Sequence, residues 1–280
     1  MIIWLASYPK SGNTWVRLFI KSYLSKNKKN FSINQEPEDD FVINKFPSKN
    51  ILEEMKINYN NFFEIAQNWI IMQERINLNN KLNFLKTHNA MCTINKSKFT
   101  NKENTLGAIY IVRDPRDIAV SFSHHFGISL VKIIENMLNE NHTIFESDFE
   151  NKSLGPGSTL LSSWANHYNS WKNYNLSEVL IIKYEDLINK TNDKFYEIVS
   201  YLNKLNKIRI DKAKIQECIQ LTSFINLQTL EKKYGFEDKT LSKNFFRKGE
   251  IGSWKNELDI DLSKRIESHF KKEMKELNYL

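Results

Sequence analysis

The chain has 280 residues, of which 41% are hydrophobic and 26% are charged, a composition typical of an ordinary globular protein with one sizeable core. No apolar run approaches the length of a membrane span, and Cys92 and Cys218 form neither a C-x-x-C motif nor a disulfide framework, which predicts a cytoplasmic protein without membrane contact. Forty basic and 33 acidic residues leave a net charge of +7, which favours anionic partners without separating nucleic acid from a small polyanionic cofactor.

Strand-like and helical segments alternate along the chain. Short apolar runs predict buried strands over residues 2–5, 83–88, 106–113 and 178–185. Helical spacing predicts helices over about 12–24, 61–75, 116–126, 159–174, 192–204 and 259–277. This alternation favours an α/β fold with a central parallel sheet flanked by helices.

Two polar segments interrupt the pattern. Residues 27–49 are polar and aperiodic, which predicts a surface excursion, and residues 127–157 close on "LGPGS", which predicts a mobile lid or an acceptor-binding insertion. No repeat or linker divides the chain, so we predict a single domain over residues 1–280.

Unusual residue clusters follow each predicted strand. They read "SYPKSGNTW", "KTH", "RDPRDIAVS" and "KYED" in chain order. Because ligands of parallel α/β sheets bind outside the carboxyl ends of the strands, we expect these clusters to converge on one site.

The first cluster is similar to a phosphate-binding loop whose lysine has moved. In the pattern G-x-x-x-x-G-K-[ST], Gly12 and Thr14 keep their places, Asn13 replaces the lysine, and Lys10 lies upstream. Backbone amides over Ser11–Trp15 could cradle a phosphate at the start of the helix. The alternative is a tight strand–helix turn with a solvated lysine.

Arg113 and Ser121 suggest a second phosphate site. Arg113 ends a predicted strand, and Ser121 lies about two turns into the following helix, so a guanidinium fork and a hydroxyl could hold a phosphate together. In the alternative interpretation Asp114 and Asp117 cap that helix and the arginine only pairs with them.

A third candidate anion clamp lies late in the chain, in "FFRKGEIGSWKN". Arg247 and Lys248 supply charge, and Gly249 allows a close backbone approach. For these three residues alone, an exposed basic turn is the simpler alternative.

His88 is the candidate general base, because a neutral imidazole at a strand end can accept a hydroxyl proton. The alternative is a structural histidine. His124 and His125 are adjacent, so they diverge on a helix and do not form a metal-ligand pair. We interpret them as structural or pocket-lining, and we predict no metal site.

Two aromatic residues, Trp15 and Phe224, could hold a nucleobase by stacking. Polar contacts to the base edge could come from Tyr184, Thr222 and Ser223. Core packing is the alternative for Phe224.

Taken together and in order, these clusters resemble the cytosolic sulfotransferase family, which uses 3′-phosphoadenosine 5′-phosphosulfate (PAPS). The resemblance spans nearly the whole chain and rests on "SYPKSGNTW", "FLKTH", "VRDPRDIAVS", "IIKYEDL", "TSF" and "RKGEIGSWKN". It implies a P-loop-like α/β fold, PAPS as sulfuryl donor, and adenosine 3′,5′-bisphosphate (PAP) as product, without a metal.

The resemblance also implies a role for each matching residue. The catalytic residues would be His88 as base, Lys10 at the leaving phosphate and Lys86 near the reaction centre. The 5′-phosphate would be held by Ser11, Gly12, Asn13, Thr14 and Trp15. The 3′-phosphate would be held by Arg113, Ser121, Arg247, Lys248 and Gly249. Adenine would lie between Trp15 and Phe224, with Tyr184 and Thr222 at its edge.

The chain departs from the family pattern at three places. Asn13 replaces the commoner threonine, Ser253 replaces the aspartate of G-D-W-K-N, and the short dimerisation motif is absent from "KNELDIDLSK", so no oligomeric state is predicted. The acceptor regions, about 31–50, 127–157 and 235–245, match no readable pattern. A small alcohol, phenol or amine is the expected acceptor.

Three other functions compete with this interpretation. An ATP-dependent P-loop small-molecule kinase needs a lysine at position 13 and an acidic Mg²⁺ ligand. A nucleic-acid binder needs a continuous basic stripe, whereas the motif cations here alternate with acids. A sulfotransferase fold without turnover is disfavoured because Lys10 and His88 are both present.

Overall fold

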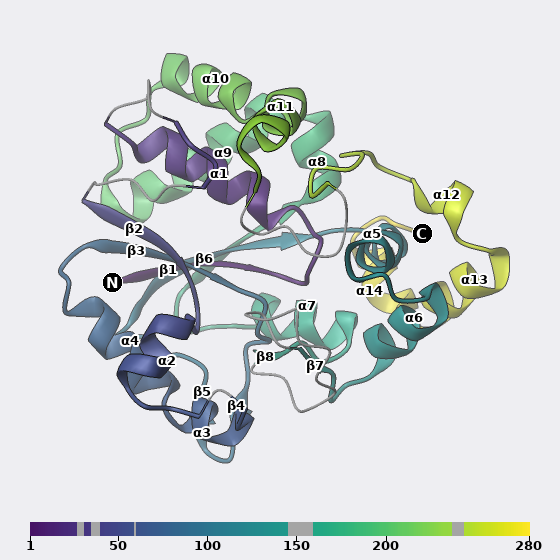
Figure 1. Cartoon of the computed structure of the whole chain (residues 1–280), viewed down its shortest axis with the longest axis horizontal. Coiled ribbons are helices and arrows are strands. Elements are labelled where there is room, and N and C mark those ends of the chain that lie inside the picture. The colour runs from purple at the N-terminus through teal and green to yellow at the C-terminus, as the bar shows by residue number, and fades with distance from the viewer. Residues whose placement is uncertain (27–30, 35–39, 59, 145–158, 237–243) are drawn as a thin grey trace.

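The core of the protein is a five-stranded sheet, in which all described strand pairs are parallel. The computed structural model describes residues 1–26, 31–34, 40–58, 60–144, 159–236 and 244–280. The strand order is β2-β3-β1-β6-β9 (Figure 1). The strands are β1 (Ile2–Ser7), β2 (Phe41–Lys45), β3 (Leu82–Thr87), β6 (Thr105–Val112) and β9 (Glu178–Lys183).

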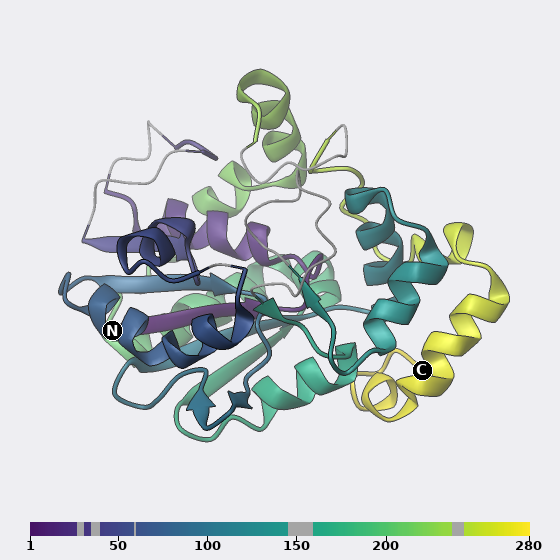
Figure 2. The same cartoon turned by 60° about the horizontal axis from the view of Figure 1, so that its bottom comes forward.

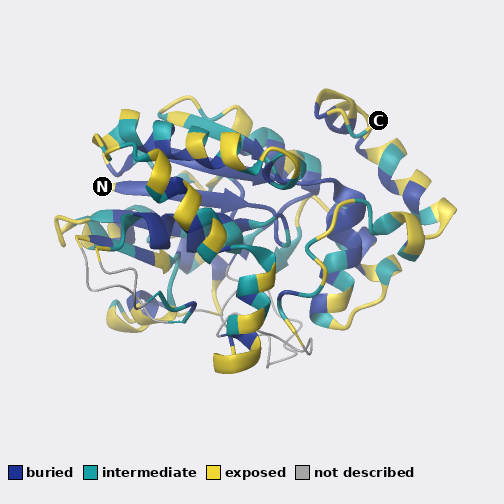
Figure 3. Cartoon of the chain, turned by 90° about the horizontal axis from the view of Figure 1, so that it is seen from above, coloured by how far each residue is buried: buried dark blue, intermediate teal, exposed yellow. Residues whose placement is uncertain are grey.

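Helices cover both faces of this sheet, as the apolar strands require (Figure 3). Trp4 of β1 faces one core and Leu5 faces the other, because successive side chains of a strand point to opposite sides. One face packs against α1 (Asn13–Leu24), α9 (Thr191–Asn206) and α10 (Lys212–Leu221). The other packs against α3 (Phe62–Gln67), α4 (Trp69–Asn77) and α7 (Trp164–Lys172).

A further group of helices lies beyond the carboxyl ends of the strands (Figures 1 and 2). It consists of α5 (Pro115–Phe126), α6 (Leu130–Leu138), α12 (Trp254–Glu257), α13 (Ile260–His269) and α14 (Lys271–Glu276). The remaining helices are α2 (Lys49–Glu54), α8 (Tyr184–Asn189) and α11 (Phe224–Tyr234). Two-residue strands pair as β4 (Thr93–Ile94) with β5 (Ser97–Lys98), and as β7 (Thr143–Ile144) with β8 (Thr159–Leu160).

The predicted α/β class and parallel sheet are confirmed, but several segments differ from expectation. The expected surface excursion contains the edge strand β2, whose Phe41 and Ile43 are buried. The predicted polar region after residue 127 contains α6, which buries Ile133, Ile134 and Met137. Both elements were missed because each has a short apolar pattern that is surrounded by polar residues in the sequence. The parts of the expected acceptor regions at 35–39, 145–157 and 237–243 lie outside the described residues.

Three predicted helices have different bounds. The segment 61–75 divides into α3 and α4 at Asn68, and 259–277 divides into α13 and α14 at Phe270. The segment 159–174 begins as β8, and its helix starts only after Ser163, whose side chain caps it. No helix in the described ranges is both long and apolar enough to cross a membrane.

Candidate active site

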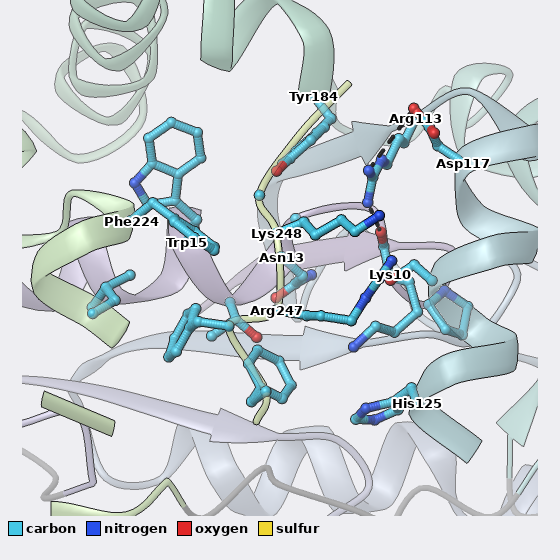
Figure 4. Close-up of a pocket in the computed structure, with 18 of the residues that line it drawn as sticks. Lys10, Asn13, Trp15, Arg113, Asp117, His125, Tyr184, Phe224, Arg247 and Lys248 are labelled. Atoms are coloured by element: carbon cyan, nitrogen blue, oxygen red, sulfur yellow. Dashed lines mark hydrogen bonds and ion pairs between the residues drawn. The ribbon is translucent and has the colours of Figure 1, made fainter. Parts of the chain in front are cut away.

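A cavity of about 680 Å³ lies where the strand-end clusters meet. The expected convergence is confirmed, since its lining includes residues from all four clusters and from the late basic segment. Every residue that the sequence analysis placed in the site lines this cavity except Ser11, which is fully buried. In the view of Figure 4, Trp15 and Phe224 lie at one side and Arg113, Asp117 and His125 at the other.

The loop between β1 and α1 turns through two left-handed residues, Lys10 at φ 67° and Gly12 at φ 101°. Gly12 is required for a second reason, because a Cβ there would lie 2.5 Å from the ring of Tyr184. The amides of Trp15 and Val16 both donate to the Gly12 carbonyl. Within the predicted Ser11–Trp15 cradle, the Trp15 amide therefore already has a backbone acceptor.

The side chain of Asn13 turns away from the ligand side of the loop. Its Nδ2 donates to the Leu5 carbonyl at 2.8 Å and to Ser7 Oγ at 3.3 Å. The residue that replaces the P-loop lysine thus braces the loop against β1. Behind it, the buried Ser11 Oγ has no hydrogen-bond partner among the described residues.

Arg113 joins the phosphate-type loop to the late basic segment. Its Nη1 donates to the Lys10 carbonyl at 3.1 Å, and its Nη2 donates to the Glu250 carbonyl at 2.9 Å. Its guanidinium lies 4.3 Å from the centre of the Tyr184 ring, which is packed beneath it. Both terminal nitrogens of Arg113 therefore donate to protein carbonyls. Its buried Nε has no partner among the described residues.

The two aspartates beside Arg113 have separate tasks. Asp114 caps α5 by accepting from the Arg116 amide, and burial raises its pKa. Asp117 lies 3.9 Å from Arg113 and accepts from the amides of Gly252 and Trp254, at 2.7 and 3.1 Å. These amides flank Ser253, so α5 itself holds the segment in which the family aspartate is missing. The capping alternative is correct for Asp114, while Asp117 anchors a distant loop.

The late basic segment folds over the cavity through Gly249. A Cβ at this residue would lie 2.5 Å from the Phe224 ring, and its φ is 66°. Next to it, Lys248 Nζ and Arg247 Nη1 lie 2.7 and 3.4 Å from Glu257.

Glu257 also accepts from His124. Desolvation raises the pKa of Glu257, but hydrogen bonds from Lys248 and His124 outweigh it and bring the pKa to about 2. Glu257 is an anion that sequence reasoning missed, because only the fold brings it to these cations.

His88 directly follows β3, with its ring against the end of β1. Its Nδ1 lies 2.7 Å from the Ser7 carbonyl, and because a carbonyl oxygen only accepts, Nδ1 carries the proton. Nε2 is then the basic atom of the neutral ring. Lys86 lines the same cavity. Lys45 of β2 is paired with Lys86 in the sheet and also lines the cavity. The sequence analysis did not predict Lys45 as a site residue, because it did not predict β2.

The predicted adenine contacts differ in accessibility. Trp15 packs edge-on against Phe195 at 5.2 Å and Tyr184 at 6.5 Å, and it lines the cavity. Thr222 is fully buried and its hydroxyl donates to the Cys218 carbonyl at 2.8 Å, so this hydroxyl is committed to α10. Ser121 lies on α5 and is partly exposed at the cavity.

Further aromatic lining escaped the sequence analysis. Lys10 Nζ lies 4.4 Å above the centre of the Phe245 ring, and His125 packs edge-on to the same ring at 5.7 Å. His125 lines the cavity, which is one of the two roles expected for it from the sequence. Across the described ranges, no three His, Cys, Asp or Glu side chains are grouped as metal ligands would be. The arrangement is suited to anion binding beside an imidazole ring.

Comparison with known proteins identifies the family. A model of the sulfotransferase domain matches residues 2–278. Sulfotransferase 1B1 of Canis lupus familiaris is 28% identical over 280 residues, which cover 96% of this chain and 82% of that protein. Cytosolic sulfotransferase 7 of Arabidopsis thaliana is 26% identical over 271 residues, which cover 94% of this chain and 76% of that protein.

The fold is also similar to solved structures. Mouse sulfotransferase SULT7A1 complexed with PAP gives a TM-score of 0.62 at 21% identity, over 98% of this chain and 84% of that chain. Retinol dehydratase in complex with androsterone and PAP gives a TM-score of 0.59 at 20% identity, over 98% of this chain and 80% of that chain. Because the family match extends over nearly the whole length, the chain belongs to the sulfotransferase domain family of enzymes.

Proposed function

We propose that this protein transfers the sulfuryl group of PAPS to a hydroxyl or amine of a small-molecule acceptor, as a single-domain cytoplasmic enzyme. The observation that carries the proposal is that one cavity brings together the turn at Gly12, the ring of His88, and the cations Arg247 and Lys248. A nucleotide with two separate phosphate groups needs anion contacts at two separate places, and the cavity offers both.

Polar atoms around the cavity fit such a donor. The amides of Asn13 and Thr14 at the start of α1, with the Thr14 hydroxyl, would hold the 5′-phosphate. Arg113 Nε, the Ser121 hydroxyl and the Lys248 ammonium would hold the 3′-phosphate.

The aromatic residues would hold the base. Trp15 and Phe224 present ring surface to adenine, and Tyr184 lies near its edge. Thr222 would contribute to the shape of the adenine site rather than a hydrogen bond, because its hydroxyl already donates to the backbone of α10.

Three side chains would act on the reacting groups. PAPS supplies the sulfuryl group. His88 Nε2 takes the acceptor proton, which increases the nucleophilicity of the acceptor oxygen or nitrogen toward sulfur. Lys10 compensates the negative charge that develops as the bond between sulfur and the phosphate oxygen breaks, and Lys86 adds positive charge nearby. PAP and the sulfated acceptor are the products.

The kinase alternative loses support at Asn13. Its side chain is bonded to Leu5 and Ser7, where a P-loop enzyme would extend a lysine toward the β- and γ-phosphates. This disposition favours a donor without a γ-phosphate.

Calorimetric titration tests the donor site directly. We expect PAP to bind with EDTA present, and AMP or ATP–Mg²⁺ to bind at least about tenfold more weakly, a difference of roughly 1.4 kcal/mol. Lys248→Ala should weaken the binding of PAP much more than the binding of AMP, because AMP has no 3′-phosphate. Lys255→Ala is the matched control, because it removes an exposed lysine from the same segment that does not line the cavity. A preference for ATP–Mg²⁺, or equal binding of AMP and PAP, would support the kinase instead.

A further inference from the structure

Two consecutive backbone carbonyls after β3 accept hydrogen bonds from ring nitrogens of α7. His167 Nε2 lies 3.0 Å from the His88 carbonyl, and Trp171 Nε1 lies 3.0 Å from the Asn89 carbonyl. His167 and Trp171 are four residues apart, so they project from one face of the helix. Helix α7 therefore holds the backbone on which the proposed base is mounted.

The proton positions of His167 follow from its partners. Its Nε2 must carry the proton, because the His88 carbonyl can only accept. Its Nδ1 then accepts from the Tyr110 hydroxyl at 2.8 Å. Both side chains are fully buried, and burial lowers the pKa of His167 to about 4, so the ring is neutral at physiological pH.

The same network reaches the start of the phosphate-type loop. The ring of Tyr8 packs edge-on against His167 with centroids 5.4 Å apart. One residue earlier, the Ser7 carbonyl accepts from His88 Nδ1. The ring of His88 is thus held by Ser7, and the backbone carbonyl of His88 is held by His167.

We propose that His167 is a positioning residue for His88: its Nε2–H holds the His88 peptide so that the ring keeps its Nδ1–H bond to Ser7 and presents Nε2 to the acceptor. Tyr110 acts behind it by keeping the proton of His167 on Nε2. This inference rests on the proposed role of His88 as base. His167 itself does not line the cavity, so it acts only through His88.

Nitrogen-15 NMR of the imidazole rings tests the inference without turnover. The chain has six histidines, and the signal lost in His88→Gln assigns His88. We expect His88 to be the Nδ1–H tautomer in the wild type and a tautomer mixture in His167→Phe. His167→Gln should restore the wild-type signature, because its amide can donate to the same carbonyl. An unchanged His88 signal in His167→Phe would overturn the proposal.

Kinetics with 4-nitrophenol as test acceptor give the second readout. We expect His167→Phe to lower kcat about tenfold to a hundredfold, since small misplacements of a catalytic group have effects of this size. The Kd for PAP should change less than about twofold, and His167→Gln should recover most of kcat.

Trp171→Phe is the matched control, because it removes the neighbouring ring donor and leaves the His88 carbonyl bonded. Equal losses of kcat in Trp171→Phe and His167→Phe would reduce His167 to a structural residue. If His167→Phe does not fold, Tyr110→Phe and His167→Gln carry the test. Tyr110→Phe should give a tautomer mixture at His167 and a loss of kcat of about threefold. A tautomer mixture at His167 that leaves both the His88 tautomer and kcat unchanged would overturn the proposal.

Failure of the proposed function gives a different pattern. Wild-type protein that binds no PAP, or that keeps full activity as His88→Gln, would refute the function. The tautomer comparison would still decide whether His167 positions His88.

Discussion

Phe224 lies so close to Gly249 that a Cβ built on the glycine would come within 2.5 Å of its Cδ2 atom and 2.6 Å of Cε2. The contact joins the start of α11 to the basic segment after Phe246, two parts of the proposed nucleotide site. The residue before Gly249 carries the ammonium that we assign to the 3′-phosphate, and Phe224 carries the ring that we assign to adenine. One close approach therefore sets the distance between the two proposed contacts.

Gly249→Ala should weaken PAP binding because the new methyl group would displace either the Phe224 ring or the basic segment. Overpacking of this kind costs about 1–3 kcal/mol, which corresponds to roughly fivefold to 150-fold in Kd. Calorimetry measures the change. Gly127→Ala is the control, since its φ of 64° is nearly the same and its Cβ would meet nothing within 4 Å. Equal effects of the two substitutions would assign the loss to backbone strain rather than to the contact.

Glu257→Gln should tighten PAP binding by about threefold to tenfold, or roughly 0.7–1.4 kcal/mol. The carboxylate occupies Lys248 and Arg247, so an entering phosphate must compete with it for these cations. Glu250→Gln removes an equal charge from the same segment and serves as the control. Weaker PAP binding in Glu257→Gln would mean that the carboxylate orients these cations for the phosphate and does not compete with it.

Asn13→Ala should lower the free energy of unfolding by about 1–3 kcal/mol, because the buried Leu5 carbonyl and Ser7 hydroxyl lose a donor. Urea denaturation measures this change. Asn173→Ala, at an exposed position after α7, should change it by less than about 0.5 kcal/mol. A fully stable Asn13→Ala that has lost PAP affinity would instead place this side chain on the ligand.

Stability should fall as the pH falls from about 6.5 to 4, because burial lowers the pKa of His167 and of His142 to about 4. In this window the unfolded chain binds protons that the folded chain does not, so each ring contributes a slope of up to about 1.4 kcal/mol per pH unit. The contribution is fully present above the unfolded value of about 6.5. Urea unfolding at several pH values should give a smaller slope for His167→Gln than for the wild type. Parallel curves for the two proteins would contradict the neutral, buried state of His167.

The sequence alone was sufficient for the parts of the site that depend on local order. Gly12 and Thr14 lie within a few residues of a strand end and a helix start, and His88 directly follows the strand pattern "NFLKT", so short-range pattern places them. The carboxyl ends of parallel strands share one edge of a sheet, which is why four separate motifs could be expected at one cavity. Short-range pattern also predicted β1, β3, β6 and β9, but it did not predict β2 or the helices α6, α10 and α11.

Tertiary structure decided the contacts that join distant segments. No local pattern indicates that Arg113 donates to Glu250, that Glu257 meets Lys248, or that His167 holds the His88 carbonyl. These pairs are 137, 9 and 79 residues apart, and in each the partner is selected by packing of elements in three dimensions rather than by spacing along the chain. The sequence thus determines which chemical groups the strand ends carry, whereas only the fold determines which of them are already engaged and which face the ligand.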